Sequence, residues 1–347
     1  MIRDYHNYNS MTIIPNTFGL AATADRYCVV DNLDDLEKLI AQGVFASAPF
    51  FVVGAGSNVV FTRHYEGVVL HLANRGVRRL VGVGESGASS DTVFVEAAAG
   101  ESWDSFVRFC VDQGWYGLEN LVSIPGTVGA APVQNVGAYG LEAKDRIFEV
   151  RTINLLTGEH RVFSNDECRF AYRDSVFKHF GAETSSPFVV TSVLFRLSAT
   201  FTPNLTYRPL AEHFSGLENV SAQAVLDFID QLRWSKLPRP ETTGSAGSFF
   251  KNPVVDAPSY ESLRQSFPGL VAFPVGDDYK LSAGWLIEQA GWKGKDLGRC
   301  GVYEKQALVL VNRGGATGDE VLRLADAVAA DVWAKFGIRL EKEAIIL

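Results

Sequence analysis

Apolar positions along the chain repeat with two periods, and each period predicts a different kind of element. Where apolar residues recur every three or four positions and end at glycine or before proline, a helix is expected. The predicted helices cover 31–43, 103–114, 221–237, 280–291 and 317–337. Short apolar runs bounded by turn residues predict strands at 49–53, 93–100, 149–163, 188–198, 306–312 and 338–347. Of these, 149–163 is interpreted as a hairpin that turns at Thr157-Gly158.

Two sequence signals fix helix starts more closely. Asn32 precedes the first helical stretch and is a preferred cap, and Thr317 with Glu320 has the spacing of a capping box. Residues 1–11 show neither period, so we expect a loose polar leader there.

Composition limits the class of protein. A length of 347 residues suits about two or three domains. The net charge of −8 argues against a general nucleic-acid-binding protein, although it allows local basic pockets for an anionic small molecule. The four cysteines are far apart and form no CxxC pair, which favours idle thiols in a reducing cytosol. No secretory signal and no membrane-spanning run is found, so we expect a cytoplasmic protein.

The stretch 117–140, GLENLVSIPGTVGAAPVQNVGAYG, is unusual for its small side chains. It contains five glycines, two prolines and three alanines, with almost no charge after Glu119. Side chains this small let a backbone approach a large or flat group and present N–H groups to it. The stretch is therefore interpreted either as the floor of a cofactor site or as a tightly packed turn region.

Two glycine motifs are candidates for phosphate-binding loops. The residues Gly54-Ala55-Gly56-Ser57-Asn58 follow a predicted strand, where a glycine turn can direct N–H groups at a phosphate. They match neither the P-loop nor the Rossmann fingerprint, and a simple strand-ending turn explains them equally well. A GxGxxG at 82–87 is followed by a polar turn and by no helix, so we interpret it as a hairpin loop.

Two further segments carry groups suited to chemistry. In 167–178, ECRFAYRDSVFK, charged and aromatic residues crowd together, which indicates either a surface turn with ion pairs or a guanidinium held to grip a carboxylate. In 244–253, GSAGSFFKNP, Ser248 lies beside Gly247, where its hydroxyl can be approached closely. The six histidines form no metal-binding pattern, so no metal site is inferred.

Taken together, these segments resemble the UDP-N-acetylenolpyruvoylglucosamine reductase family. The resemblance rests on NTFGL (16–20), GAGSNVVF (54–61), the stretch 117–140, ECRFAYRDSVFK, GSAGSFFKNP, KLSAGWLI (280–287), QALVLVN and the terminal LEKE (340–343). They occur in the family's order over nearly the whole chain, from about Asn16 to Leu347.

The resemblance implies an α+β fold. It predicts a vanillyl-alcohol-oxidase (PCMH) type FAD-binding domain at 12–200, with subdomains at about 12–73 and 74–200, and a smaller C-terminal substrate-binding domain at 201–347 whose last strand returns to the active site. FAD is expected to be non-covalent. The residues that would hold it are Gly54, Ala55, Gly56, Ser57, Asn58, Ser123, Ile124, Pro125, Gly126, Gly129, Gln134, Asn135, Gly137, Ala138 and Tyr139.

The family's reaction implies roles for three further residues. A hydride passes from NADPH through FAD to the enolpyruvyl carbon of UDP-N-acetylglucosamine enolpyruvate, in peptidoglycan precursor synthesis. Arg173 and Glu343 match the positions that stabilise the enolate-like intermediate, and Ser248 matches the proton donor. Glu343 can donate a hydrogen bond only when protonated, so we expect burial to raise its pKa. Candidates for binding the substrate or NADPH phosphates are Tyr139, Tyr172, Tyr207, Arg233, Lys236, Asn252 and Gln306.

Two positions depart from the family's usual sequence. The tail reads LEKE where LEPE is usual, and Lys342 removes the extended constraint that proline places on the residue before it. This puts the placing of Glu343 in question, with Glu341 as the alternative. Ala171 stands where glycine is common in FGYRDS, and we expect the change to be tolerated.

Two other functions remain open on the sequence. A related FAD oxidase acting on an alcohol or sugar would consume oxygen and would not need Ser248 and Glu343. A flavin- or nucleotide-sugar-binding module without catalysis predicts damaged catalytic positions, whereas Arg173, Ser248 and a terminal glutamate are present. No nucleic-acid or membrane partner is expected, and protein partners stay open.

Overall fold

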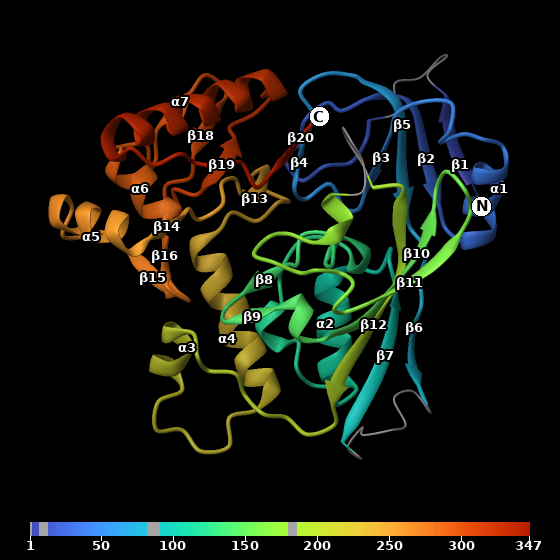
Figure 1. Cartoon of the computed structure of the whole chain (residues 1–347), viewed down its shortest axis with the longest axis horizontal. Helices are drawn as coiled ribbons and strands as arrows, with labels where there is room; N and C mark the ends of the chain where they lie inside the picture. The colour runs from blue at the N-terminus through green and yellow to red at the C-terminus, as the bar shows by residue number, and fades with distance from the viewer. Residues whose placement is uncertain (1, 7–12, 82–90, 180–185) are drawn as a thin grey trace. The chain divides into compact units, whose positions relative to one another are not determined.

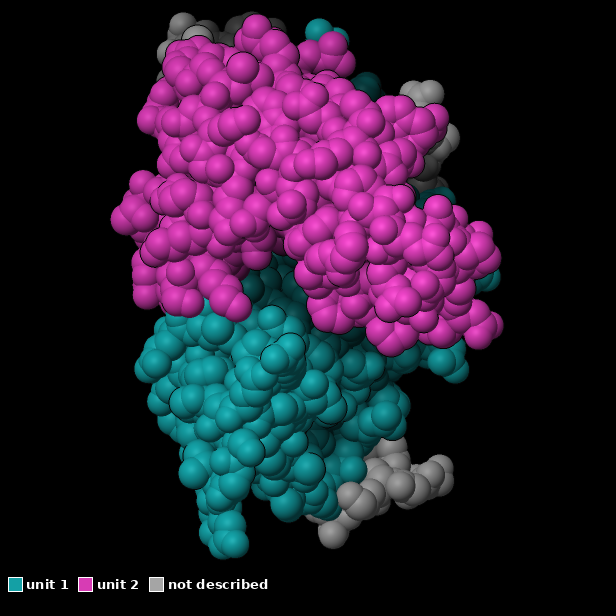
Figure 2. Space-filling model, turned by 90° about the vertical axis from the view of Figure 1, so that its left-hand side faces the viewer, with its two compact units in different colours: residues 1–12, 24–55, 66–233 teal, residues 13–23, 56–65, 234–347 magenta. Residues whose placement is uncertain are grey.

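The computed structural model describes residues 2–6, 13–81, 91–179 and 186–347 (Figure 1). The chain forms two compact units, each with its own hydrophobic core. The first unit comprises 1–12, 24–55 and 66–233, and the second comprises 13–23, 56–65 and 234–347 (Figure 2). Each unit mixes helices and strands, which confirms the expected α+β class.

The two units divide the chain differently from the expected domain bounds of 12–200 and 201–347. Residues 201–233 pack in the first unit because side chains such as Leu210 and Ile229 join its core. Phe18 and Val60 belong to the core of the second unit, although both precede residue 200. Order along the chain does not predict this division, because two short N-terminal segments supply apolar side chains to the second core.

The first unit contains a four-stranded sheet in the order β1-β2-β5-β3. The strands are Ile2–His6, Ala24–Val30, Tyr65–Leu72 and Phe50–Val53, and helix α1 is Leu33–Ala41. Asn32 caps α1 as predicted, since its side chain accepts from Asp35 N at 2.9 Å. The prediction of a loose leader was wrong for Ile2–His6, which pairs antiparallel with β2. A ladder of main-chain bonds does not require a side-chain pattern, so residues 2–6 carry no periodic signal for this strand.

A second, antiparallel sheet has the order β11-β10-β12-β7-β6. Its strands are His160–Ser164, Ile147–Asn154, Phe188–Ser198, Thr92–Ala98 and Val77–Leu80, and α2 is Trp103–Asp112. The predicted hairpin is confirmed, with a left-handed Gly158 at its turn. The predicted aromatic stripe of α2 is also core, because Phe106 lies 5.0 Å from Phe195 of β12 between ring centroids. The GxGxxG at 82–87 lies outside the described residues.

Short elements complete the first unit. They are η1 (Glu119–Leu121), η2 (Val128–Ala130), β8 (Gly137–Ala138), β9 (Leu141–Glu142), η3 (Ala143–Asp145), η4 (Val176–Lys178), α3 (Arg208–His213) and α4 (Ala222–Lys236), whose last three residues belong to the second unit. Helix α4 is as predicted. Helix α3 has six residues, too few for a helical period to be visible in the sequence.

The second unit contains a four-stranded sheet, a small three-stranded sheet and a parallel strand pair. The first sheet, in the order β13-β19-β18-β17, contains Ser245–Ser248, Val309–Asn312, Cys300–Val302 and Asp296–Leu297. The second, in the order β14-β16-β15, contains Val254–Asp256, Asp278–Leu281 and Ala272–Val275. The helices are α5 (Ala257–Ser266), α6 (Ala283–Gln289) and α7 (Gly318–Phe336), and the pair joins β4 (Val59–Val60) to β20 (Ile345–Ile346).

Two predictions for this unit have different outcomes. The capping box of α7 is confirmed, since Thr317 Oγ1 accepts from Glu320 N at 3.3 Å and Glu320 Oε2 accepts from Thr317 N at 2.9 Å. The strand expected over 338–347 is limited to Ile345–Ile346 as a named strand, because the residues before it form only an isolated bridge.

Candidate functional site

The glycine loop at 54–58 follows β3 directly, and both of its glycines are required by close packing. A Cβ added at Gly54 would lie 2.7 Å from Thr127 Oγ1. Gly56 is left-handed, with φ of +65°, and a Cβ there would lie 2.5 Å from the carbonyl oxygen of Pro15. No other residue type meets both demands at Gly56, because side chains rarely adopt that φ. The turn therefore depends on glycine whatever it binds.

The glycine-rich segment after η1 enters the left-handed region at only a few positions. Ser123, Gly126, Asn135 and Tyr139 have φ of +60°, +145°, +46° and +50°. Between buried neighbours, the segment has partly exposed positions at Ile124, Pro125, Gly126, Gln134, Gly137 and Ala138. Gly126, Gly137 and Ala138 have little or no side chain, so the main chain there can lie close to a flat ring system.

Gly129 packs closely against the residue that follows β7. A Cβ at Gly129 would lie 2.5 Å from the Cβ of Ala99, and the amide of Gly129 donates to the carbonyl of Ala99 at 2.8 Å. This glycine is explained by packing against the end of β7, so a cofactor contact is not needed to account for it.

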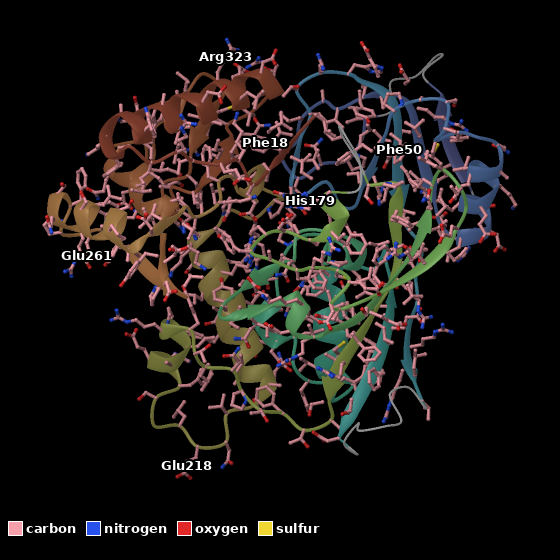
Figure 3. All side chains as sticks on the ribbon, in the orientation of Figure 1. Phe18, Phe50, His179, Glu218, Glu261 and Arg323 are labelled. Carbon is pink, nitrogen blue, oxygen red and sulfur yellow. The ribbon has the colours of Figure 1, made fainter. Side chains whose placement is uncertain are left out.

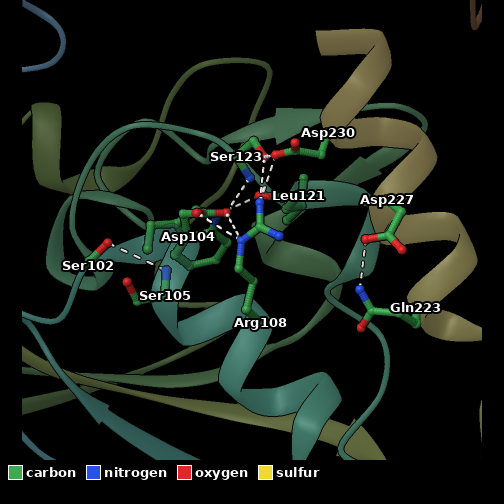
Figure 4. A network of polar contacts seen from close by, with 10 residues as sticks. Ser102, Asp104, Ser105, Arg108, Leu121, Ser123, Gln223, Asp227 and Asp230 are labelled. Carbon is green, nitrogen blue, oxygen red and sulfur yellow. Dashed lines mark hydrogen bonds and ion pairs between the residues drawn. The ribbon is translucent and has the colours of Figure 1, made fainter. Parts of the chain in front are cut away.

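Ser123 is held in a polar network that joins α2 to α4 (Figure 4). Its amide donates to Asp104 Oδ1 at 2.6 Å, and its hydroxyl donates to Asp230 Oδ1. The guanidinium of Arg108 donates to Ser123 Oγ at 3.0 Å and to Asp230 Oδ1 at 2.7 Å. The side chain and amide of Ser123 are thus engaged within the unit. A contact between Ser123 and a cofactor would therefore use its main-chain carbonyl.

Asn135 is fully buried and joins two segments of the first unit. Its Nδ2 donates to Glu142 Oε2 at 2.9 Å and to the carbonyl of Ala171 at 3.0 Å, and its Oδ1 accepts from Lys144 N at 3.1 Å. Ser175 adds a second connection, since its hydroxyl donates to the carbonyl of Val133 at 2.6 Å. These bonds attach the 171–175 loop to the glycine-rich segment.

Arg173 lies in a tight turn of that loop. The amides of Ala171 and Asp174 each donate to the other's carbonyl, at 3.0 and 3.2 Å, so that Tyr172 and Arg173 are the two central residues. Arg173 has φ of +54°, and its Nη2 donates to the carbonyl of Gly137 at 2.7 Å. Ala171 is not among the described residues with a positive φ, so alanine is tolerated there as expected.

The ends of the 171–175 loop carry further polar contacts. His179 (Figure 3) pairs with both carboxylate oxygens of Asp174, at 2.9 and 2.8 Å. Lys178 donates from Nζ to the carbonyl of Arg173 at 2.6 Å. The loop therefore has the polar contacts of a surface turn, together with a guanidinium held in a defined direction.

Tyr139, Tyr207 and Arg233 come together in the first unit. The rings of Tyr139 and Tyr207 meet edge to face, with centroids 5.3 Å apart. Burial raises the pKa of the Tyr139 hydroxyl, and the Arg233 guanidinium, which is hydrogen-bonded to it, opposes that shift. Burial also lowers the pKa of Arg233. The Arg233 guanidinium is therefore placed against Tyr139, another candidate substrate residue.

Two asparagines that the sequence did not single out hold this cluster. Asn120 donates to the carbonyls of Tyr139 and Asn204, at 2.8 and 3.0 Å, and Asn204 donates to the carbonyl of Gly140 at 3.0 Å. Asn120 is buried, and a polar residue inside the GLEN tetrapeptide was the available signal. The loop before Tyr207 is therefore attached to the tip of the β8–β9 hairpin.

Ser248 ends β13 in the second unit and is exposed. It pairs with Val309 of β19, and the register shifts between Ser245 and Ser248, where Gly247 has φ of +68°. Within the described part of the chain, nothing beyond its own neighbours lies within 4 Å of a Cβ added at Gly247, so this glycine serves the bulge and not a close contact. A bulge of this kind redirects the side chain that follows it, here the Ser248 hydroxyl.

The chain's tail runs beside the residues that follow Ser248. Lys251 N donates to the carbonyl of Glu341 at 2.9 Å, and Glu343 N donates to the carbonyl of Phe249 at 2.8 Å. Asn58 Nδ2 donates to the carbonyl of Glu343 at 3.2 Å. This register places Glu343 opposite Phe249, next to Ser248 in the sequence, whereas Glu341 forms an ion pair with Lys251. The structure favours Glu343 over Glu341 as the residue near Ser248.

The remaining candidates of the second unit have structural contacts of their own. Asn252 Oδ1 accepts from Ala283 N at 2.9 Å, which fixes the start of α6. Gln306 Oε1 accepts from Leu308 N at 3.4 Å and would lie 2.9 Å from a Cβ at Gly284. Lys236 is exposed at the end of α4.

The described residues offer neither a metal site nor a membrane-spanning helix. No group of His, Cys, Asp or Glu there could hold a metal ion, and no helix is long and apolar enough to cross a membrane. The four cysteines are free and buried, as expected, and burial raises the pKa of the Cys28 and Cys168 thiols to about 12.

Comparison with known proteins gives the family. Residues 24–164 match the family model described as an FAD binding domain, and residues 239–347 match the C-terminal domain of UDP-N-acetylenolpyruvoylglucosamine reductase. This confirms an FAD-binding domain followed by a C-terminal domain.

Relatives that align with this chain over nearly their whole length are named UDP-N-acetylenolpyruvoylglucosamine reductase. The UDP-N-acetylenolpyruvoylglucosamine reductase of Azoarcus sp. is 48% identical over 96% of this chain and 95% of its own, and that of Bdellovibrio bacteriovorus is 45% identical over 99% of both. The crystal structure of the Thermus caldophilus enzyme has a TM-score of 0.62 and 24% identity, and covers 100% of this chain and 98% of its own. This chain belongs to the UDP-N-acetylenolpyruvoylglucosamine reductase family.

Proposed function

We propose that this protein reduces the enolpyruvyl group of UDP-N-acetylglucosamine enolpyruvate to give UDP-N-acetylmuramate, with NADPH as the source of hydride. The reaction belongs to peptidoglycan precursor synthesis, and we place it in the cytoplasm. The observation that carries the proposal is the similarity to reductases of this name over nearly the whole chain, at 45–48% identity.

The chain's residues fit FAD. The turn at 54–58 requires glycine at two positions, and the partly exposed Gly126, Gly137 and Ala138 have little or no side chain, which suits a flat ring. All four thiols are buried, which supports non-covalent binding. When bound, FAD supplies the two-electron chemistry that relays hydride from NADPH to the substrate.

We assign to Arg173 and Glu343 the stabilisation of the negative charge that develops on the substrate carboxylate. A guanidinium can bind a carboxylate through two parallel bonds, and its direction is already fixed by the bond to Gly137. Preorganised donors of this kind stabilise charge that appears only in the transition state. Glu343 joins it as a donor when protonated.

Ser248 is assigned the protonation of the substrate carbon. Its exposed hydroxyl follows a bulge, on the strand beside which the Glu343 segment runs. A hydroxyl is a weak acid, yet a strongly basic carbon in contact with it can take its proton. Substrate binding is assigned to Tyr139, Tyr172, Tyr207, Arg233, Lys236, Asn252 and Gln306.

The test is an anaerobic experiment on the FAD-bound protein that follows the visible absorbance of the flavin. One equivalent of NADPH should bleach the band, and UDP-N-acetylglucosamine enolpyruvate should restore it. Bleaching that is reversed only by air would overturn the proposal in favour of an oxidase. A protein that cannot be reconstituted with FAD would remove both enzyme functions.

A further inference from the structure

The backbone of Arg173 is held in a conformation that arginine does not favour. The turn from Ala171 to Asp174 places Arg173 third, with φ of +54°, where glycine or asparagine is the usual choice. A residue with a side chain is disfavoured in the left-handed region, because its Cβ comes too close to the neighbouring carbonyl oxygen. Such a conformation persists only where surrounding contacts determine it, and those contacts can be named here.

The strongest of these contacts comes from Lys178. Its Nζ donates to the carbonyl of Arg173 itself, at 2.6 Å, from the last position of η4. Asn135 fixes the other side of the turn through the carbonyl of Ala171 at 3.0 Å. Two donors therefore hold the carbonyls of the first and third residues of the turn, and of these two only Lys178 carries a charge.

The conformation of the turn decides where the guanidinium points. With the backbone left-handed, Arg173 Nη2 reaches the carbonyl of Gly137 at 2.7 Å. A Cβ at Gly137 would lie 3.2 Å from Arg173 Nη1 and 2.9 Å from Glu142 Cγ, so the space for the side chain is narrow. If the turn relaxed, the guanidinium would leave this position.

We propose that Lys178 is a positioning residue for Arg173, holding the left-handed turn so that the guanidinium can take the carboxylate of the substrate. The proposal rests on the proposed function, in which Arg173 binds that carboxylate. Lys178 acts through Arg173 and need not touch the substrate.

A binding experiment separates this role from a general structural one. The FAD-bound, oxidised protein is titrated calorimetrically with UDP-N-acetylmuramate, which has the carboxylate, and with UDP-N-acetylglucosamine, which lacks it. Lys178→Met should weaken binding of the first by about tenfold, or ~1.4 kcal/mol, and leave the second within about twofold. Lys178→Arg, which keeps a charged donor, should restore most of the loss.

A matched control makes the same chemical change at a lysine with the same type of bond. Lys335 also donates from Nζ to a main-chain carbonyl, that of Gln289 in the second unit. Lys335→Met should leave both affinities unchanged. Equal loss of both ligands in Lys178→Met, or equal behaviour of the two methionine variants, would overturn the proposal.

A double-mutant cycle tests whether Lys178 acts through Arg173. In the Arg173→Ala background, Lys178→Met should have no further effect on binding of UDP-N-acetylmuramate, because contacting residues that act as a unit are not additive. Full additivity would contradict the inference. If Lys178→Met does not fold, Lys178→Gln takes its place. The quantity compared is again the ratio of the affinities for UDP-N-acetylmuramate and UDP-N-acetylglucosamine.

The failure of the inference and the failure of the proposed function are distinguishable. If the wild-type protein is not reoxidised by UDP-N-acetylglucosamine enolpyruvate, the proposed function fails. If it is reoxidised and binds UDP-N-acetylmuramate, but Lys178→Met keeps the wild-type ratio of affinities, only the inference fails.

Discussion

The ring of Tyr207 meets the ring of Tyr139 edge to face, with centroids 5.3 Å apart and an interplanar angle of 80°. Tyr139 lies in the glycine-rich segment, and Tyr207 directly precedes the short helix α3, more than sixty residues later in the sequence. The contact joins a candidate cofactor residue to a candidate substrate residue within the first unit.

Removing the Tyr207 ring should affect both stability and binding. Tyr207→Ala is expected to lower the free energy of unfolding by at least the ~0.5–1.5 kcal/mol that an aromatic pair contributes beyond its buried area. It should also weaken binding of UDP-N-acetylmuramate. Tyr207→Phe keeps the ring and should retain the stability, so urea unfolding and calorimetry of both variants separate the ring from the hydroxyl. A phenylalanine variant as unstable as the alanine variant would contradict this assignment.

Ser248→Ala should separate the two halves of the reaction. NADPH should bleach the flavin at the wild-type rate, whereas reoxidation by UDP-N-acetylglucosamine enolpyruvate should slow by roughly 10²-fold or more, because only protonation loses its donor. Anaerobic stopped-flow absorbance measures both rates. Ser262→Ala, on the exposed side of α5, is the control. Equal slowing of both half-reactions would show that Ser248 is not the proton donor.

Ser123→Ala should lower the free energy of unfolding, because it removes a member of the polar network in Figure 4. The variant loses the hydroxyl that donates to Asp230 and accepts from Arg108. Hydrogen bonds to charged groups contribute about 1.5–3 kcal/mol, and we expect the lower end because the partners are partly exposed. Ser105→Ala, on the exposed side of α2, should change the free energy of unfolding little. Equal free energies of unfolding for Ser123→Ala and Ser105→Ala, measured in urea, would mean that the network does not stabilise the unit.

Glu320 should make stability depend on pH. Hydrogen bonds from Arg299 and from the Thr317 amide lower the pKa of Glu320 from 4.5 to about 2. Because the unfolded state then binds the proton more readily, this contribution is present above pH 4.5 and is lost as the pH falls towards 2. The difference in unfolding free energy between wild type and Glu320→Gln should therefore shrink over that window. A difference that stays constant would exclude the ionised capping box as its source.

Lys342→Pro, which restores the residue usual in the family, should be tolerated. The main-chain bonds beside Lys342 involve Glu341 O and Glu343 N, so proline at 342 removes neither of them. Loss of the exposed ion pair with Asp326 costs about 0–1 kcal/mol. A proline that fits the native backbone raises the free energy of unfolding by about 0.4–1 kcal/mol, because it lowers the conformational entropy of the unfolded chain.

The control for this variant is Ile345→Pro, which removes an amide that donates to Asn58 O at 2.9 Å. It should unfold at clearly lower urea concentration than Lys342→Pro. Similar destabilisation of both variants would mean that the extended tail does not accept proline at 342.

The sequence by itself determined the features that depend on neighbouring residues. The Asn32 cap, the Thr317–Glu320 capping box and the apolar stripe of α2 all involve positions within a few residues of one another, so their periods and spacings were sufficient. The family followed from motifs in a fixed order, and that too is a property of the sequence.

Only the tertiary structure decided which polar groups serve one another. Asn135 and Ala171 are 36 positions apart, and Arg108 and Asp230 are 122 apart, so no local pattern connects them. The pairing of Ile2–His6 with β2 and the division into two units were hidden for the same reason. The packing of distant segments brings such donors and acceptors together, and a buried polar group then requires the partner that packing supplies.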